Sequence, residues 1–378
     1  MPRVLWVPGL IIALAAGLGV GGCRKAAPQE NASGSKARAG MHREADGAMP
    51  QAPRPRAAGR SPARPVAARR PATRPADPDP AASVLPREAR LPADVEQQLA
   101  RKRLLSFPSR WNGKVHVRQT GRVRLLYLGK RMDIVHTRLH LDRPADLISP
   151  YQQCLLLGFG LFEKPRTEVK RVAMIGLGGG ALTRFFRAKR PELVFHSVEI
   201  DPVVVAVARR LFGVKDTPGY RSYAMDGRRF LQEAKRPYDV IIMDAFDAAA
   251  TLPKQLASQE FFRLLKARLT PHGVLLMNFL VHDRRIYASV WKTLKTVFPR
   301  VYRMPLRRFR SFNTLLLAAA DPRRMPDKAT LRGRIPGLKS SYSVAFPLKR
   351  CWEALDADRL DLKAATLIRD PTPARGAP

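Results

Sequence analysis

The feature that most limits how this chain can fold is residues 172–180, VAMIGLGGG, where a short apolar run leads straight into a glycine-rich turn. Residues 181–190 follow with the apolar spacing of a helix, and residues 193–198 form a second apolar run that ends at Glu199 and Asp201. Strand, glycine turn, helix, strand and acid, in this order, predict a βαβ unit that binds an adenosine-type cofactor.

The glycines of this turn let the backbone approach a ligand closely, because a residue without a side chain leaves room and accepts positive φ angles. An acid about 20 residues beyond such a turn commonly meets ribose hydroxyls, which makes Glu199 and Asp201 cofactor-binding candidates. Gly176-x-Gly178-x-x-Ala181 also fits the dinucleotide fingerprint, so a nicotinamide dinucleotide site is an alternative at this point. The predicted cofactor-binding glycines are Gly176, Gly178, Gly179 and Gly180.

Downstream, the apolar residues keep alternating between strand-like and helix-like spacing. They predict further strands at 220–224, 238–243, 274–278, 301–304 and 314–319, and helices at 202–211, 227–234, 258–269 and 286–298. This alternation indicates an α/β protein with a Rossmann-like, mostly parallel sheet that carries helices on both faces. A small β module precedes it, because residues 114–131 alternate like a hairpin and residues 134–141 add a third strand.

Composition divides the chain into five regions. They are a signal peptide with a lipobox, or a membrane anchor, at 1–23; a disordered linker rich in Pro, Ala and Arg at 24–95; the β module at 96–148; the Rossmann-like nucleoside-binding domain at 149–320; and a poorly patterned C-terminal extension at 321–378. The linker is predicted to be disordered because its many prolines exclude long helices, and it has too few large apolar residues to offset the entropy of ordering.

The N-terminal region predicts attachment to a membrane. Residues 5–22 are apolar, and residues 20–23, VGGC, resemble a bacterial lipobox, so we expect a lipoprotein that is lipidated at Cys23. One alternative is a membrane anchor, whose following basic residues would hold the downstream chain in the cytoplasm. Another is a misassigned start, with Met41 or Met49 as the first residue of a cytoplasmic protein.

Charge and cysteine content restrict the partners less than they first suggest. The formal net charge is +37, which is typical of nucleic-acid-binding proteins. The excess is mostly arginine spread over the whole chain, so we attribute it to compositional bias and predict no nucleic-acid partner. The three cysteines do not predict a disulfide framework, and Cys154 and Cys351 are expected to be core thiols. No spacing typical of metal ligands occurs, so no metal is predicted.

Acidic residues follow several of the predicted strands. Glu199 with Asp201 ends one strand, Asp226 follows the next, and Asp244 with Asp247 ends a third. Ligands of an open parallel sheet bind at the carboxyl ends of its strands, where these side chains meet. We therefore predict one shared site for a cofactor and a substrate at this edge.

From about residue 111 to residue 280 the chain resembles the spermidine synthase (polyamine aminopropyltransferase) family. That family combines an N-terminal β module with a Rossmann-like fold of the S-adenosylmethionine methyltransferase type. The landmarks that carry the resemblance are YQQ at 151–153, GGGA at 178–181, VEIDP at 198–202, DG at 226–227 and DAFD at 244–247.

The resemblance implies a binding role for three of these positions. Glu199 would hold the ribose hydroxyls of the nucleoside, and Asp226 with Gly227 would contact its adenine end. The implied group donor is decarboxylated S-adenosylmethionine or S-adenosylmethionine itself.

The resemblance also implies the reaction. Asp244 would be the general base that accepts a proton from an amine, because alkyl ammonium groups have pKa values near 10 and do not attack while protonated. Asp247 would be catalytic as well and would help to hold the amine, with Tyr151 and Gln152 as further substrate-binding residues. The acceptor would be a small amine or polyamine, and a homodimer is left open.

Three positions depart from the family pattern. Ala181 replaces an aspartate that contacts the amino end of the aminopropyl donor, Gln152 replaces a histidine, and Ala248 replaces a proline. We therefore keep three hypotheses: aminopropyl transfer from the decarboxylated donor, methyl transfer from S-adenosylmethionine, and a non-catalytic nucleoside-binding protein tethered to the envelope.

Overall fold

The computed structural model describes residues 84–130, 132–246, 251–355 and 362–371. The predicted signal or anchor at 1–23 and the linker as far as residue 83 lie outside the described residues, so both stay predictions. Asp247 and Ala248 lie outside them as well. None of the described helices is long and apolar enough to span a bilayer.

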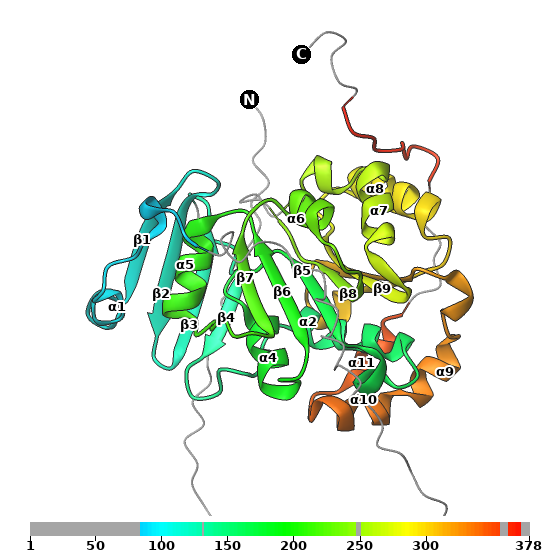
Figure 1. Ribbon diagram of the computed structural model, residues 1–378, viewed down its shortest axis with the longest axis horizontal. Coiled ribbons are helices and arrows are strands. Elements are labelled where there is room, and N and C mark those ends of the chain that lie inside the picture. The colour runs from blue at the N-terminus through cyan, green and yellow to red at the C-terminus, as the bar shows by residue number, and fades with distance from the viewer. Residues whose placement is uncertain (1–83, 131, 247–250, 356–361, 372–378) are drawn as a thin grey trace, which may run out of the picture. The chain divides into compact units, whose positions relative to one another are not determined.

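Seven of the described strands form one sheet in the order β10-β11-β9-β8-β5-β6-β7. Figure 1 labels five of them, β7, β6, β5, β8 and β9. Strands β5 to β9 pair in parallel, whereas β11 runs antiparallel to both of its neighbours. The mostly parallel sheet predicted from the sequence is therefore present. Its strands are β5 (Arg171–Ile175), β6 (Val194–Glu199), β7 (Tyr220–Ala224), β8 (Tyr238–Met243), β9 (Leu269–Leu280), β10 (Val301–Pro305) and β11 (Asn313–Ala319).

Helices cover both faces of this sheet because successive strand residues point to opposite sides. In β5, Val172 and Met174 belong to one buried core, and Ala173 and Ile175 belong to the other. The second core is completed by α6 (Gly227–Glu233), α7 (Gln259–Ala267) and α8 (Arg284–Val297). The first is completed by α2 (Pro150–Leu155), η3 (Leu156–Leu161), α4 (Ala181–Lys189) and helices of the C-terminal region.

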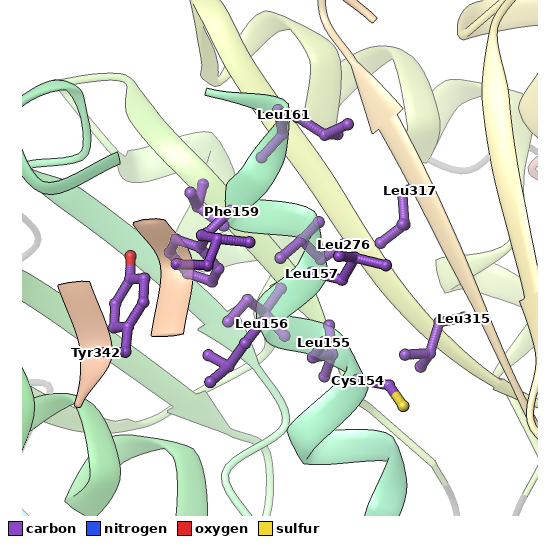
Figure 2. Packing of buried hydrophobic residues seen from close by; sticks show 14 of the residues in the cluster. Cys154, Leu155, Leu156, Leu157, Phe159, Leu161, Leu276, Leu315, Leu317 and Tyr342 are labelled. Carbon is purple, nitrogen blue, oxygen red and sulfur yellow. The ribbon is translucent and has the colours of Figure 1, made fainter. Parts of the chain in front are cut away.

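Figure 2 shows part of the first core, where η3 places Leu157 and Phe159 among side chains of the sheet and of the C-terminal helices. The short helix α2 leads directly into the 3-10 helix η3. All six residues of η3 are buried, so tertiary packing rather than helix propensity sets its conformation.

The N-terminal β module is an antiparallel sheet in the order β1-β2-β3-β4. It contains the predicted hairpin and third strand, and adds a strand that the sequence analysis did not predict. The strands are β1 (Leu104–Ser109), β2 (Gly113–Thr120), β3 (Val123–Leu128) and β4 (Thr137–His140). The module packs through a third core on α5 (Pro202–Leu211), the helix after β6, so it is joined directly to the nucleotide fold.

Packed structure begins earlier than the predicted boundary at residue 95. The 3-10 helix η2 (Arg87–Ala89) precedes α1 (Val95–Lys102), and Ala89 is buried in the third core. Leu85 and Leu91 also pack on this core. Residues 84–95 thus differ from the predicted disordered linker. A few apolar side chains are enough to order this segment, because they pack on the surface of the third core.

The C-terminal extension is more ordered than its weak patterning indicates. It contains α9 (Lys328–Gly333), α10 (Ile335–Tyr342) and α11 (Leu348–Glu353), which contribute buried side chains to the first core. Cys351 of α11 forms a disulfide with Cys154 of α2, with Cα atoms 5.2 Å apart. The prediction of two free core thiols is therefore wrong, since a separation of 197 residues gives no local signal of pairing. The remaining short elements are α3 (Pro165–Glu168), η4 (Lys254–Leu256), η5 (Arg307–Phe309) and η6 (Pro322–Arg324).

Candidate active site

A cavity of about 540 Å³ lies at the carboxyl ends of β5, β6, β8 and β9 and is closed on one side by the β module. This is the edge at which the sequence analysis placed the shared site. Most of the predicted site residues line the cavity: Tyr151, Gln152, Gly176, Gly178, Glu199, Asp226, Gly227 and Asp244. The β module contributes Trp111, Asn112, Ile134, Val135, His136 and Thr137.

The glycine turn divides into residues that face the cavity and residues that shape the turn. Gly176 has a φ of 95°, and a Cβ atom there would lie 2.3 Å from the backbone oxygen of Asp244, so only glycine fits. Gly178 also lines the cavity. Gly179 and Gly180 do not, which differs from the prediction. Gly179 donates its backbone N–H to Thr137 Oγ1 at 3.0 Å, and Gly180 is the N-cap of α4 with a φ of 70°.

Glu199 joins the end of β6 to the glycine turn. Its Oε2 accepts the backbone N–H groups of Leu177 at 3.1 Å and Gly178 at 3.2 Å. Its Oε1 accepts only a longer bond, 3.3 Å, from the backbone N–H of Asp201. Burial raises the pKa of Glu199, although these backbone donors oppose the rise. One carboxylate oxygen is thus fixed by the turn, and the other remains able to accept a ligand hydroxyl.

Asp244 ends β8 and receives a hydrogen bond on each carboxylate oxygen. Asn278 Nδ2 donates to Oδ1 at 2.8 Å, and the Tyr151 hydroxyl donates to Oδ2 at 3.0 Å. Burial raises the pKa of Asp244 to about 6, with the charge of Glu199 adding to the rise and the two donors opposing it. A carboxylate with a pKa near neutrality is suited to accept and release a proton at physiological pH.

Tyr151 and Gln152 form the substrate side of this arrangement. Gln152 is buried and donates its Nε2 to the Tyr151 hydroxyl at 3.1 Å, which orients the hydroxyl hydrogen towards Asp244. Burial, followed by the charge of Asp244, raises the pKa of Tyr151 well above its ordinary value. Tyr151 is therefore a hydrogen-bond donor and does not compete as a base.

Asp226 lines the cavity and also caps α6, because its Oδ1 accepts the backbone N–H of Arg229 at 2.9 Å. Asp201 has a different position from the one predicted. It is buried and outside the cavity lining, and its oxygens accept hydrogen bonds from Ser109 Oγ at 2.5 Å, Asn112 Nδ2 at 2.7 Å and Val203 N at 2.9 Å. Asp201 therefore caps α5 and ties it to the β module, and it does not face the cavity.

Two asparagines of the site were missed in the sequence analysis. Asn278 of β9 contacts Asp244, and Asn313 at the start of β11 donates its Nδ2 to Asn278 Oδ1 at 2.8 Å. Asn278 carried a weak signal in the sequence, because it is a lone amide in an apolar run. In the structure it is 3% exposed. Asn313 carried none, since its role depends on a strand pairing that the sequence does not state.

The described residues contain no cluster of three or more His, Cys, Asp and Glu side chains that could hold a metal ion. The absence of a metal remains a prediction for the whole chain.

Comparison with known proteins supports the resemblance. The family model for the spermine/spermidine synthase domain matches residues 150–313. A polyamine aminopropyltransferase of Chromobacterium violaceum is 27% identical over 234 residues, which cover 62% of this chain and 86% of that protein. An eEF1A lysine and N-terminal methyltransferase of Bos taurus is 31% identical over 169 residues, but these cover only 24% of that protein. The predicted resemblance and the predicted transferase-like enzyme class are confirmed.

Solved structures support the fold class. A probable spermidine synthase from Corynebacterium glutamicum ATCC 13032 aligns with a TM-score of 0.51 at 21% identity, over 57% of this chain and 80% of that chain. At this identity the likeness concerns the fold, and it agrees with the predicted Rossmann-like sheet preceded by a β module.

Proposed function

We propose, on the premise that residues 150–313 form a spermidine synthase-like domain, that this transferase-like enzyme moves an aminopropyl group from decarboxylated S-adenosylmethionine to a small amine or polyamine. The observation that carries the proposal is Asp244, which faces the cavity as a doubly hydrogen-bonded carboxylate with a pKa of about 6. Glu199 lies in the same cavity with one oxygen left for a nucleoside hydroxyl.

The charge of the cavity fits two cationic reactants. Among its described lining residues, Glu199, Asp226 and Asp244 are acidic, and no lysine or arginine occurs. The chain as a whole carries a formal net charge of +37, so the cavity is a local exception to a basic protein. Charges beyond about 8 Å are screened at physiological ionic strength, so a sulfonium donor and an ammonium acceptor respond mainly to these three acids.

The reaction needs one base and one leaving group. The acceptor nitrogen loses a proton to Asp244, and its lone pair then attacks the propyl carbon next to the sulfonium sulfur. The carbon–sulfur bond breaks, and its electron pair stays on sulfur, so that neutral methylthioadenosine leaves. Asp244 holds the abstracted proton until solvent removes it, which a pKa of about 6 allows near neutral pH.

A methyltransferase using S-adenosylmethionine is the second candidate. It is favoured by Ala181, which lines the cavity where an acid would otherwise hold the amino end of the decarboxylated donor. The parent donor carries an additional carboxylate, and the described lining residues include no lysine or arginine to pair with it. This difference makes the decarboxylated donor our first choice.

The test is to incubate the full chain with each donor and a series of diamines, and to measure methylthioadenosine and S-adenosylhomocysteine as products. Aminopropyl transfer predicts methylthioadenosine from the decarboxylated donor. Methyl transfer predicts S-adenosylhomocysteine from the parent compound. Asp244→Asn should abolish product while still binding methylthioadenosine, which at 100 times its Kd stabilises a protein by about 2.7 kcal/mol. Both candidates would be refuted if neither product formed and no nucleoside stabilised the protein.

A further inference from the structure

A line of side-chain hydrogen bonds runs from β11, two strands away from β8 in the sheet, to the carboxylate of Asp244. Asn313 Nδ2 donates to Asn278 Oδ1 at 2.8 Å, and Asn278 Nδ2 donates to Asp244 Oδ1 at 2.8 Å. At its outer end, Ser311 Oγ donates to Asn313 Oδ1. Asp244 directly follows β8, Asn278 lies on β9 and Asn313 begins β11, and these three strands are neighbours in the order β8-β9-β11.

The direction of this line follows from amide chemistry. An asparagine side chain has one acceptor end and one donor end, and these ends point in opposite directions. Because Asn313 fills the acceptor end of Asn278, the amino group of Asn278 is the end that faces Asp244. Asn278 is almost fully buried, so water does not replace either contact easily.

We propose that Asn278 and Asn313 are positioning residues that keep Asp244 charged and aligned as a proton acceptor. Asn278 does so directly, and Asn313 acts through Asn278 by fixing which end of its amide faces the carboxylate. The inference deepens the proposed function and rests on it, but the hydrogen-bond polarity at Asp244 can be tested without any turnover.

Other groups near Asp244 also influence whether its carboxyl is protonated. Tyr151, from α2, donates to its second oxygen. Glu199, at the end of β6, adds a like charge that favours the protonated carboxyl. Asp226 and His136 line the same cavity from the loop after β7 and from the β module. Burial and Glu199 both disfavour the charged form, so the donors on the two oxygens are what oppose protonation.

The experiment is a pH titration of the full chain labelled with ¹³C at the aspartate carboxyl carbons, in which Asp244→Asn identifies the Asp244 signal. Asn313→Leu, which removes the donor without adding charge, should raise the titration midpoint of Asp244 by about half to one pH unit. Asn313→Asp should raise it further. An aspartate there accepts from Asn278 Nδ2 and turns the Asn278 oxygen towards Asp244, and it also adds a like charge.

Asn278→Leu removes the direct donor and should raise the midpoint by at least one pH unit. Thr314→Val is the matched control, because Thr314 follows Asn313 on β11 and points to the opposite face of the sheet. That control should leave the midpoint within about 0.2 pH unit. Methylthioadenosine affinity, measured by calorimetry, should stay within about twofold in Asn313→Leu, since this variant leaves the nucleoside side of the cavity intact.

The proposal is overturned if Asn313→Leu and Asn313→Asp bind methylthioadenosine normally and both leave the Asp244 midpoint where it is in the wild type. Asn313 is only partly buried, so its variants keep the test available even if Asn278→Leu does not fold. Where transfer is measurable, the acidic limb of the rate–pH profile should move by the same interval as the midpoint. If the variants shift the Asp244 midpoint as expected but no transfer is detected in wild type, the proposed function is refuted and the positioning role still holds.

Discussion

Asp244 should make the folded protein less stable as the pH rises, and replacing it by asparagine should remove that dependence. Its folded pKa is about 6, against an ordinary value of 3.8. The folded state therefore binds more protons than the unfolded state between these two pH values. Stability contributed by this group is fully present below pH 3.8 and is lost as the pH rises through about 6.

The size of the effect follows from the same two values. A difference of about two pKa units corresponds to about 3 kcal/mol of unfolding free energy. Asp244 faces the cavity and is only partly buried, so its carboxylate keeps some hydration. This hydration reduces the expected change in unfolding free energy to about 1–3 kcal/mol. Relative to wild type, Asp244→Asn should therefore gain about 1–3 kcal/mol of stability between pH 4 and pH 7.

The quantity to measure is how the difference in unfolding free energy between Asp244→Asn and wild type changes with pH. Its value at a single pH also contains a contribution that does not depend on pH. The asparagine amino group would meet a donor from either Tyr151 or Asn278, and that conflict costs stability equally at every pH. Urea unfolding, followed by tryptophan fluorescence, gives the free energy of unfolding at each pH from 4 to 8. Leu280→Met, a neutral change in the same cavity lining, is the control and should run parallel to wild type.

A difference between Asp244→Asn and wild type that stays constant over this pH range would refute the reasoning. A difference that falls with rising pH would show that the folded site stabilises the carboxylate relative to water. Either result would remove the physical basis for assigning Asp244 as the base.

Three further predictions concern binding and stability. Glu199→Gln should weaken methylthioadenosine binding by at least about tenfold in calorimetry, because a neutral amide accepts ribose hydroxyl bonds less strongly than a carboxylate; unchanged affinity would remove Glu199 from the nucleoside site. Gly176→Ala should lower the free energy of unfolding by at least about 2 kcal/mol in urea, because its Cβ would meet the Asp244 backbone at 2.3 Å; a silent change would contradict the geometry of the turn. Cys351→Ser should lose up to about 5 kcal/mol for a disulfide that closes 197 residues. Dithiothreitol should destabilise wild type and leave Cys351→Ser unaffected, and equal behaviour of the two proteins would count against the disulfide.

The central sheet could be predicted because its signals are local. Strands such as β5 and β8 are short, largely apolar runs, and the acids at residues 199, 226 and 244 lie at strand ends or within two residues of them. In a parallel sheet these ends meet at one edge, so the cavity followed from the order of elements alone. The two departures are Asp201 and the glycines at 179–180, which do not line the cavity. Asp201 and Gly180 are helix N-caps, and Gly179 binds Thr137 through its backbone N–H.

What could not be predicted depends on contacts between distant segments. The C-terminal helices are short and weakly patterned, and they hold their shape through the first core rather than through their own propensity. The pairing of Cys154 with Cys351 and the contact of Asn278 with Asn313 each require the finished fold. A sequence pattern shows periodicity along the chain, whereas these features depend on contacts between residues that are far apart in the sequence.

The disulfide has a consequence for where this protein can work. Glutathione and thioredoxin keep cytosolic cysteines reduced, so a structural bond between Cys154 and Cys351 is expected to persist on the oxidising side of a membrane. We infer that the bond favours the predicted lipoprotein over the two alternatives for the N-terminal region, a membrane anchor or a misassigned start, that would place the domain in the cytoplasm. If the protein does lie outside the cytoplasm, the proposed reaction requires a nucleoside donor on that side of the membrane.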